Sequence, residues 1–512
     1  MSEPSHGVRI YDVADLAETE ARAAELAAAL APGDLVTLTG DLGAGKTAFA
    51  RALIRTLAKD PDLEVPSPTF TLIQTYDTPR LHVVHADLYR IGSPDELAGL
   101  GWDEAAEGAA VLLEWPERAG DALPEDRLDV EIRLVPGSPD ARHIVVTPTG
   151  RWVERLDRNV ALRKLLAASG WDAADRIPIQ GDASTRAYER LVRGEETAIL
   201  MIAPRRPDGP PVRDGKPYSA IAKLAESVHA FVAMADGLRG LGYSAPEVLA
   251  ADLDAGLLIV EDLGGEGVLG PEGPIPERYE LATALLADLH RRDLPEALPV
   301  RDDGEHVLPA YDLDALLMEA ELLLDWYVPH IVRRPVSATA CDRFVALWRA
   351  ALEPVQAQRR TWTLRDYHSP NLLWLPEREG LKRMGIIDFQ DAVMGHPAYD
   401  LASLLQDARR AVPERLELDL FQRYLRARRE ADPDFDMADF AASYALMAAQ
   451  RATKVLGIFV RLDRRDGKPG YLRHVPHMEA YLRRNLSHPA LAELRVWYRQ
   501  NLPTLFETGT PR

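Results

Sequence analysis

The clearest chemical pattern in the sequence is "GDLGAGKT" at residues 40–47, which has the spacing G-x-x-x-x-G-K-T. This spacing is typical of a phosphate-binding loop, where glycine lets backbone N–H groups approach the phosphates and the dipole of the next helix favours an anion. We predict that Lys46 reaches the β- and γ-phosphates of ATP and that the Thr47 hydroxyl binds Mg²⁺. The rest of the cradle is predicted to come from Asp41, Leu42, Gly43, Ala44 and Gly45.

The residues on either side of this loop predict the strand and the helix that a phosphate-binding loop requires. "LVTLT" at 35–39 is a short apolar, β-branched run, and "KTAFARALIRTLA" at 46–58 has helical character. Two more apolar runs end in an acid, with Asp87 after "LHVVHA" and Glu114 after "AVLL". Each acid is a candidate to hold the metal or to orient water at the phosphate end of a parallel sheet, and spacing alone does not rank them.

A second phosphoryl-transfer pattern lies far along the chain, in "LRDYHSPN" at 364–371. Asp366 and Asn371 have the D-x-x-x-x-N interval of a kinase catalytic loop, and "GIIDFQDA" places Asp388 directly after an apolar strand. We predict that Asp366 accepts the proton of the attacking hydroxyl. Asn371 and Asp388 are predicted to hold Mg²⁺ on the nucleotide phosphates.

The residues around this second pattern differ from those of a protein kinase. No G-x-G-x-x-G precedes the strand "TAILMIAP", which has Met201 where protein kinases have a lysine. No A-P-E segment follows Asp388. We predict nucleotide contacts from Ser184 and Thr185 in the turn "QGDASTRA" and from Glu261 in the hinge "VEDLGG".

The order of the expected elements indicates an α/β chain with two domains. A helix at 17–30, the strand–loop–helix unit and a hairpin within 129–148 predict a P-loop domain with a mostly parallel sheet, assigned to residues 1–156. A new helix begins near Leu156. Residues 157–512 are predicted to form a bilobal, kinase-like domain whose second lobe is largely helical.

Composition narrows the class of protein and its partners. With 512 residues, the chain exceeds what one core serves, and its 60 basic and 80 acidic residues give a net charge of −20. A net acidic surface repels nucleic acid, so we expect any link to RNA to run through partners. The single cysteine, Cys341, excludes an internal disulfide, and no secretory signal or long apolar run is present. We therefore expect a cytoplasmic protein with no membrane segment.

Four motifs in the first part, in order, resemble the bacterial TsaE ATPases, which support threonylcarbamoylation of the adenosine beside the tRNA anticodon. They are "GDLGAGKT", "SPTFTLIQTY" at 67–76, "HADLYRI" at 85–91 and "LLEWPER" at 112–118. The resemblance covers residues 1 to about 152 and implies an ATPase that acts on TsaB- and TsaD-like proteins, of which the TsaD-like one transfers the carbamoyl group. It implies contact with tRNA only through those partners.

The TsaE resemblance also implies roles for single residues. Thr47 and Glu114 would bind Mg²⁺, and Asp87 would assist hydrolysis. Ser67 and Thr69 would lie on a nucleotide-sensing loop, and Thr19 would contact the nucleotide. Trp115 is either a buried aromatic wedge or a partner contact.

The second part resembles the aminoglycoside phosphotransferases and, among them, the AmgK-type kinases, which phosphorylate the anomeric position of N-acetylmuramate and N-acetylglucosamine. The motifs are "GDASTRAYERL", "LRDYHSPNLLWL" and "GHPAYDLASLLQDAR". This resemblance implies ATP, Mg²⁺ and an amino-sugar acceptor. Asp400 is predicted to cap or brace the catalytic loop rather than to take part in the chemistry. Ile202 and Leu364 depart from the family, which often has aspartate and histidine there.

The sequence therefore predicts a tRNA-modification ATPase fused to a small-molecule kinase. Two alternatives remain for the second half. It could be a regulatory nucleotide-binding module, although that would not require Asp366, Asn371 and Asp388 together. It could instead phosphorylate another alcohol, such as an aminoglycoside or a choline-like molecule, because fold does not fix the acceptor.

Overall fold

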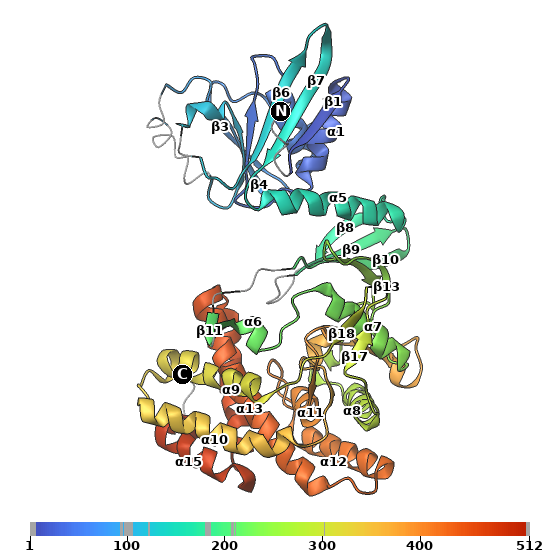
Figure 1. Ribbon diagram of the computed structural model, residues 1–512, viewed down its shortest axis with the longest axis vertical. Coiled ribbons are helices and arrows are strands. Elements are labelled where there is room, and N and C mark those ends of the chain that lie inside the picture. The colour runs from blue at the N-terminus through green and yellow to red at the C-terminus, as the bar shows by residue number, and fades with distance from the viewer. Residues whose placement is uncertain are drawn as a thin grey trace. The chain divides into compact units, whose positions relative to one another are not determined.

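The structure is a computed structural model that describes residues 7–507 except 93–95, 97–105, 121–122, 180–185, 206–208, 210, 214 and 302. The chain divides into two compact units, Met1–Asp172 and Ala173–Arg512, coloured blue to teal and teal to red in Figure 1. The domain boundary expected between residues 156 and 157 stays a prediction. The division into compact units places the whole helix that follows Arg151 in the first unit. No helix among the described residues combines the length and the apolar character that crossing a bilayer requires.

The first unit is built on one seven-stranded sheet with the order β1-β7-β6-β2-β5-β4-β3. Its strands are β1 (Arg9–Val13), β2 (Leu35–Thr39), β3 (Ile73–Asp77), β4 (His82–Asp87), β5 (Ala110–Glu114), β6 (Leu128–Val135) and β7 (Ser138–Pro148). The centre, from β6 through β2 and β5 to β4, is parallel as the sequence predicts. The remaining pairings, at the two edges, are antiparallel.

The helices α1 and α2 begin differently. In α1 (Leu16–Ala27), Asp15 accepts from the N–H of Glu18 at 2.9 Å, and Glu18 accepts from the N–H of Ala14 at 2.7 Å, so two side chains bind backbone N–H groups at the start of the helix. The helix α2 (Lys46–Ala58) starts at Gly45 with no side-chain cap. A core shared by α1, α2 and the sheet includes Phe49 and Leu53, which are fully buried. This core fixes the start of α2 at the end of β2.

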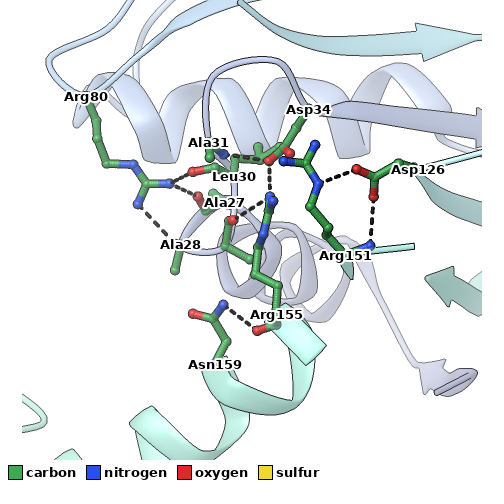
Figure 2. Close-up of polar contacts among 11 residues, drawn as sticks. Ala27, Ala28, Leu30, Ala31, Asp34, Arg80, Asp126, Arg151, Arg155 and Asn159 are labelled. Carbon is green, nitrogen blue, oxygen red and sulfur yellow. Dashed lines mark hydrogen bonds and ion pairs between the residues drawn. The ribbon is translucent and has the colours of Figure 1, made fainter. Parts of the chain in front are cut away.

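The helix α5 (Trp152–Ala168) is attached to the first unit by its first two turns, as Figure 2 shows. Trp152 and Leu156 are part of the core, and the guanidinium of Arg155 lies 4.6 Å from the Trp152 ring centre. Arg155 also donates to Asp34, whose carboxylate is buried and accepts from the N–H of Ala31 at 2.6 Å. The Asp34 carboxylate therefore joins the turn before β2 to α5.

The smaller lobe of the second unit is a five-stranded sheet with the order β13-β14-β10-β9-β8, and all its pairings are antiparallel. Its strands are β8 (Asp175–Ile179), β9 (Ala187–Arg193), β10 (Glu196–Ile202), β13 (Val248–Asp252) and β14 (Leu257–Glu261). The helix α7 (Val228–Gly240) belongs to the same core as the inner face of this sheet. β14 then leads into the larger lobe.

The larger lobe is mostly helical, as predicted, and Figure 1 shows its helices in yellow to red. Its helices are α8 (Pro276–Arg291), α9 (Leu313–Leu322), the π-helical continuation η3 (Leu323–Val332), α10 (Ala338–Gln356), α11 (Ala398–Leu405), α12 (Glu414–Ala431), α13 (Met437–Asp466), α14 (Val475–Asn485) and α15 (Ala492–Asn501), with the short α6 (Tyr218–Ile221) before them. The helix α13 packs against α9, α11, α14 and η3. It is therefore the central helix of this lobe.

Short strands carry the loops that the sequence predicts to be catalytic. Strand β19 (Thr361–Thr363) pairs with β22 (Val393–Gly395), and β20 (Leu372–Trp374) pairs with β21 (Met384–Ile386). The remaining two-stranded ribbons are β11 (Pro211–Arg213) with β12 (Lys216–Pro217), β15 (Leu269–Gly270) with β16 (Gly273–Pro274), and β17 (Ala297–Pro299) with β18 (Glu305–Val307). The loop after β19 and the loop after β21 both lead away from these paired strands, which brings Asp366 and Asp388 to the same region.

The buried contact of Asp34 predicts a specific loss of stability. Asp34→Ala leaves the Arg155 guanidinium and the Ala31 N–H without their acceptor, so we expect the first unit to lose about 2–3 kcal/mol of unfolding free energy. The measurement is amide hydrogen exchange of peptides from β2 and α5 across a urea series. Asp157→Ala is the control, because that carboxylate is 69% exposed in its pair with Arg9 and should contribute less than about 1 kcal/mol. Equal effects of the two variants would contradict this role.

Candidate functional sites

The phosphate-binding loop has a backbone that only glycine can adopt at two positions. Gly45 precedes α2 with φ at 109°, and Gly40 has φ at 138°. A Cβ on Gly40 would lie 2.2 Å from the carbonyl oxygen of Ile132, which would force the loop off β6. Gly43 also has a positive φ, at 78°, and Leu42 is 75% exposed at the tip of the loop. The loop therefore presents backbone rather than side chains at the start of α2.

Lys46 lies over the loop that contains it. Its Nζ donates to the carbonyl oxygens of Gly40 at 2.7 Å and Asp41 at 3.0 Å, and it lies 3.8 Å from the centre of the Trp115 ring. Burial lowers the pKa of Lys46, while the charges of Glu114 and Asp87 oppose that shift. The half-buried Trp115 is therefore in contact with the loop lysine, which the sequence did not reveal. Contact between Trp115 and a partner stays a prediction.

The two acids that are candidates to hold the metal or orient water, Asp87 and Glu114, have different hydrogen-bond partners. Asp87 and Glu114 are paired residues of β4 and β5. The Thr47 hydroxyl donates to Glu114 Oε2 at 3.1 Å. Asp87 Oδ2 accepts instead from Ser67 Oγ at 3.1 Å and Thr69 Oγ1 at 3.0 Å. Glu114 is thus beside the predicted metal-binding hydroxyl, and Asp87 holds the loop that contains the serine and the threonine.

Two residues that support this site were missed from the sequence. His85 is fully buried on β4, and its Nε2 is 2.9 Å from Glu114 Oε1. A histidine inside the apolar run "LHVVHAD" was the available indication of a buried polar contact. Arg142 on β7 donates from Nε to the carbonyl oxygen of Ala44 at 2.7 Å, and nothing near it in the sequence indicates that role.

Thr19 is the predicted nucleotide contact for which the structure shows another partner. It is 4% exposed on α1, and its hydroxyl donates to the carbonyl oxygen of Asp15 at 2.9 Å. This bond is the usual one for a threonine inside a helix. The nucleotide contact of Thr19 stays a prediction.

The structure brings the three predicted kinase residues together in the second unit. Asn371 Nδ2 donates to the carbonyl oxygen of Asp366 at 2.9 Å and lies 3.3 Å from Asp388 Oδ2. Gln390, which the sequence analysis did not single out, donates to Asp388 Oδ1 at 2.7 Å. All four side chains line a cavity of about 820 Å³ between the two lobes of this unit. Arg186 reaches the same carboxylate, with NH1 3.8 Å from Asp388 Oδ1.

Asp366 is held by its neighbours in the catalytic loop. Asp400 accepts from the N–H groups of Leu364 at 2.6 Å and Arg365 at 2.9 Å, which confirms the predicted brace. Burial raises the pKa of Asp400 to about 7 against these two bonds. The backbone of Arg365 has φ at 66°, and its guanidinium donates to Glu319 at 2.7 Å. These contacts fix the turn that presents Asp366 to the cavity.

The surroundings of Asp366 and Asp388 shift the pKa values of the two carboxylates in opposite directions. Burial alone would raise the pKa of Asp366, but the charges of His368 and then Lys454 lower it below its ordinary value. Desolvation, followed by the negative charge of Asp366, raises the pKa of Asp388. Asp366 is therefore ionised at neutral pH, as a group that accepts a proton must be. A cation between the two carboxylates would favour the charged form of Asp388.

Asp407 fixes the other end of the catalytic loop. Its Oδ2 accepts from the N–H of Ser369 at 2.9 Å and the hydroxyl of Ser369 at 2.5 Å, and its Oδ1 accepts from the N–H of Arg409 at 2.7 Å. Burial would raise the pKa of Asp407, but His368, with Nδ1 4.0 Å away, and the bonds from Ser369 hold it well below its ordinary value. One carboxylate thus joins the catalytic loop to the segment after α11.

The end of the cavity next to the small lobe contains the predicted nucleotide contacts. Met201 and Glu261 line it, and Glu261 also accepts from Arg378 and, at 3.4 Å, from Arg239. The predicted contacts Ser184 and Thr185 lie outside the described residues. Glu261 is therefore a paired hinge carboxylate beside the cavity, and its contact with nucleotide stays a prediction.

The opposite end of the cavity is formed largely by one face of α13. Positions three, four, seven, eight and eleven residues after Arg451 share a helix face with it, and all of them line the cavity. These are Lys454, Val455, Ile458, Phe459 and Leu462. Tyr399, Arg409 and Tyr471 complete this wall. This wall could not be predicted from the sequence, because nothing in the residues of α13 indicates which face of the helix meets the catalytic loop.

Comparison with known families gives two separate matches along the chain. Residues 13–143 match the family described as threonylcarbamoyl adenosine biosynthesis protein TsaE. Residues 175–434 match the phosphotransferase enzyme family. The two matched segments fall in the two compact units.

Curated relatives of two kinds agree with this division. An N-acetylmuramate/N-acetylglucosamine kinase of Caulobacter vibrioides is 40% identical over 363 residues, which cover 68% of this chain and 97% of that protein. A tRNA threonylcarbamoyladenosine biosynthesis protein TsaE of Rickettsia bellii is 42% identical over 118 residues, which cover 23% of this chain and 81% of that protein. The crystal structure of Bacillus subtilus YdiB covers 31% of this chain and 96% of its own, at 33% identity and a TM-score of 0.26.

Asp407 predicts a pH-dependent contribution to stability. Its pKa is lowered on folding, so its contribution is present above the unfolded value near 4 and is lost as the pH falls through the folded value. Asp407→Asn should therefore lower the unfolding free energy of the second unit by about 2–4 kcal/mol at pH 7, with a smaller difference below about pH 4. Urea titrations followed by hydrogen exchange of α11 and α13 peptides measure this. The exposed Asp434→Asn is the control, and a difference that does not change with pH would exclude the assigned role.

Proposed function

This chain belongs to the TsaE family through its first unit and to the phosphotransferase enzyme family through its second, and from this we propose that it joins a tRNA-modification ATPase to an amino-sugar kinase. The observation that carries the proposal is the presence of two complete phosphoryl-transfer sites of different construction. One has backbone N–H groups at the start of α2, and the other has the side chains of Asp366, Asn371 and Asp388. ATP is the nucleotide at both.

In the first site we assign ATP hydrolysis for tRNA threonylcarbamoyladenosine biosynthesis. Lys46 would exchange its two carbonyl acceptors for the β- and γ-phosphates, which are stronger acceptors. Thr47 and Glu114 are 3.1 Å apart and supply the oxygen ligands that Mg²⁺ prefers, so the residues fit the ion. When bound, the ion would neutralise charge on the phosphates. Asp87 is assigned to the attacking water, in contact with Ser67 and Thr69.

In the second site we assign transfer of the γ-phosphoryl group of ATP to the anomeric hydroxyl of N-acetylmuramate or N-acetylglucosamine. Asp366 takes the hydroxyl proton, the oxygen attacks the γ-phosphorus, and ADP leaves with the bridging oxygen. Asn371 and Asp388 lie beside each other, and an amide oxygen and a carboxylate are both ligands that Mg²⁺ accepts, so the residue types fit the ion; when bound, it would neutralise charge on the phosphates. The acceptor is taken from the names of relatives such as the Caulobacter vibrioides kinase.

The walls of the second cavity support an amino sugar over the other acceptors. Arg409, Arg451 and Lys454 line the acceptor end, and these cations disfavour an aminoglycoside or a choline-like alcohol, which carry positive charge themselves. The regulatory alternative is disfavoured because the acid, the amide and the metal-binding carboxylate are all in place.

We also propose the setting in which the first site works. TsaB- and TsaD-like proteins are the expected partners, and the net charge of −20 agrees with contact to tRNA through them rather than directly. We propose a cytoplasmic location, because both proposed reactions consume ATP. These assignments rest on the TsaE family match.

The ATPase assignment is tested with Lys46→Ala and Glu114→Ala in the full chain. Each variant should reduce ATP hydrolysis stimulated by TsaB- and TsaD-like proteins at least about 100-fold, because a main electrostatic contact of the transition state is lost. Release of inorganic phosphate is the measurement. Lys164→Ala, an exposed change on α5, should leave the rate unchanged. Full stimulated activity in either site variant would refute the assignment.

The kinase assignment is tested with Asp366→Asn in the full chain. The wild-type protein should convert both N-acetylated sugars to their 1-phosphates, and the variant should lose at least about 100-fold in kcat, because the proton acceptor is gone. Phosphorus NMR of the product identifies the phosphorylated carbon and is not affected by hydrolysis of ATP at the first site. Asp419→Asn, which alters a surface pair with Arg423, is the control. Nucleotide binding without any sugar phosphate would favour the regulatory alternative.

A further inference from the structure

The acceptor end of the second cavity contains a positive charge that the proposed phosphoryl transfer does not use. Arg451 is 5% exposed on α13 and lines the cavity. Its Nη1 donates a hydrogen bond to the carbonyl oxygen of Gln406 at 3.3 Å. Among the residues that the structure describes, no carboxylate forms an ion pair with it. A buried guanidinium held by a single carbonyl is costly unless an anion meets it.

Lys454, one helical turn further along α13, adds to this charge. Its Nζ is 2.7 Å from Glu319 Oε1 and donates to the Tyr399 hydroxyl at 3.2 Å. The same glutamate also pairs with Arg365 at 2.7 Å, so two cations share one carboxylate. Because positions three apart lie on one helix face, Arg451 and Lys454 face the cavity together. Lys454 therefore shares its carboxylate with Arg365, and Arg451 beside it forms no ion pair among the described residues.

The position of this wall relative to the catalytic base limits what it can bind. Arg451 and Lys454 both act electrostatically on Asp366, which places them near the hydroxyl that Asp366 would activate. The phosphate end is built differently, from Asn371 and Asp388 with Arg186 3.8 Å from the latter carboxylate. An anionic group on the acceptor itself, rather than a phosphate of ATP, is the ligand that suits the α13 wall.

We propose that Arg451, supported by Lys454, binds the carboxylate of an acidic sugar acceptor and so makes the second site prefer N-acetylmuramate to N-acetylglucosamine. The two sugars differ by the lactyl ether on the former, whose carboxylate is ionised at neutral pH. A guanidinium matches a carboxylate with paired N–H donors, and such a charged bond is stronger than a neutral one. The uncharged sugar gains nothing from this contact. The inference rests on the proposed kinase function of the second unit.

The first test is Arg451→Met in the full chain. We expect kcat/KM for N-acetylmuramate to fall about 10- to 100-fold and kcat/KM for N-acetylglucosamine to change less than about threefold, since only the acidic sugar loses a charged bond. Both constants come from sugar 1-phosphate measured by phosphorus NMR. Arg410→Met is the matched control: it removes a neighbouring exposed arginine that does not line the cavity.

The ratio of the two constants distinguishes carboxylate binding from other roles of Arg451. A parallel loss for both sugars would overturn the inference, because it would indicate that the arginine serves the phosphoryl group or the fold. An unchanged preference for N-acetylmuramate would overturn it as well.

A second test leaves the protein unchanged and therefore does not depend on the variant folding. The methyl ester of N-acetylmuramate keeps the lactyl group but has no charge. We expect the wild-type protein to use the ester about 10- to 100-fold less efficiently than the acid. Equal use of the ester and the acid would overturn the inference. Failure of the wild-type protein to phosphorylate either sugar would instead refute the proposed kinase function, so the two failures are distinguishable.

Discussion

The constraint on which both sites depend is the cost of placing carboxylates close together in partly buried positions. An isolated buried carboxylate is unstable, and neighbouring negative charges raise one another's pKa. In the second unit this cost is met by hydrogen-bond donors: backbone N–H groups of the catalytic loop bind Asp400, and Ser369 of that loop and the N–H of Arg409 bind Asp407. In the first unit Thr47 and His85 bind the two oxygens of Glu114. The positions of these hydrogen-bond donors therefore determine where each carboxylate can lie.

The two units build their proposed phosphate sites from different parts of the chain. The first unit uses main-chain N–H groups, so its loop needs glycine where a Cβ would strike β6, as at Gly40. The second unit uses side chains, so its backbone is held in turns of positive φ at Arg365 and Asp388. Both strained turns are next to residues with dense hydrogen bonding. That bonding offsets the cost of about 1–3 kcal/mol that such a conformation carries for a non-glycine residue.

The sequence was most informative where chemistry and local structure come from the same few residues. The loop before α2 and the pairing of Asp366 with Asn371 each lie within eight consecutive residues, and the structure has both as predicted. Contacts between distant segments could not be predicted, because each of their residues alone has an ordinary sequence environment. Arg142 reaches Ala44 across 98 residues, and Ser369 reaches Asp407 across 38. The hairpin predicted within 129–148 is formed by β6 and β7. The antiparallel pairs β1–β7 and β3–β4 were not predicted, because the pattern of a strand does not show which strand will pair with it.

The charge distribution in the second cavity follows from the same long-range packing. The acids Asp366 and Asp388 come from two loops on short paired strands, whereas Arg451 and Lys454 come from α13, which packs on α9 and α11. The lysine is held there by the fully buried Glu319 of α9, which also holds Arg365 beside the catalytic base. One buried carboxylate thus couples the position of the catalytic turn to the position of the basic wall. An acceptor with both a reactive hydroxyl and an anionic group would contact both, and this arrangement explains how a fold shared by many kinases can select its acceptor through a helix remote in sequence from the catalytic loop.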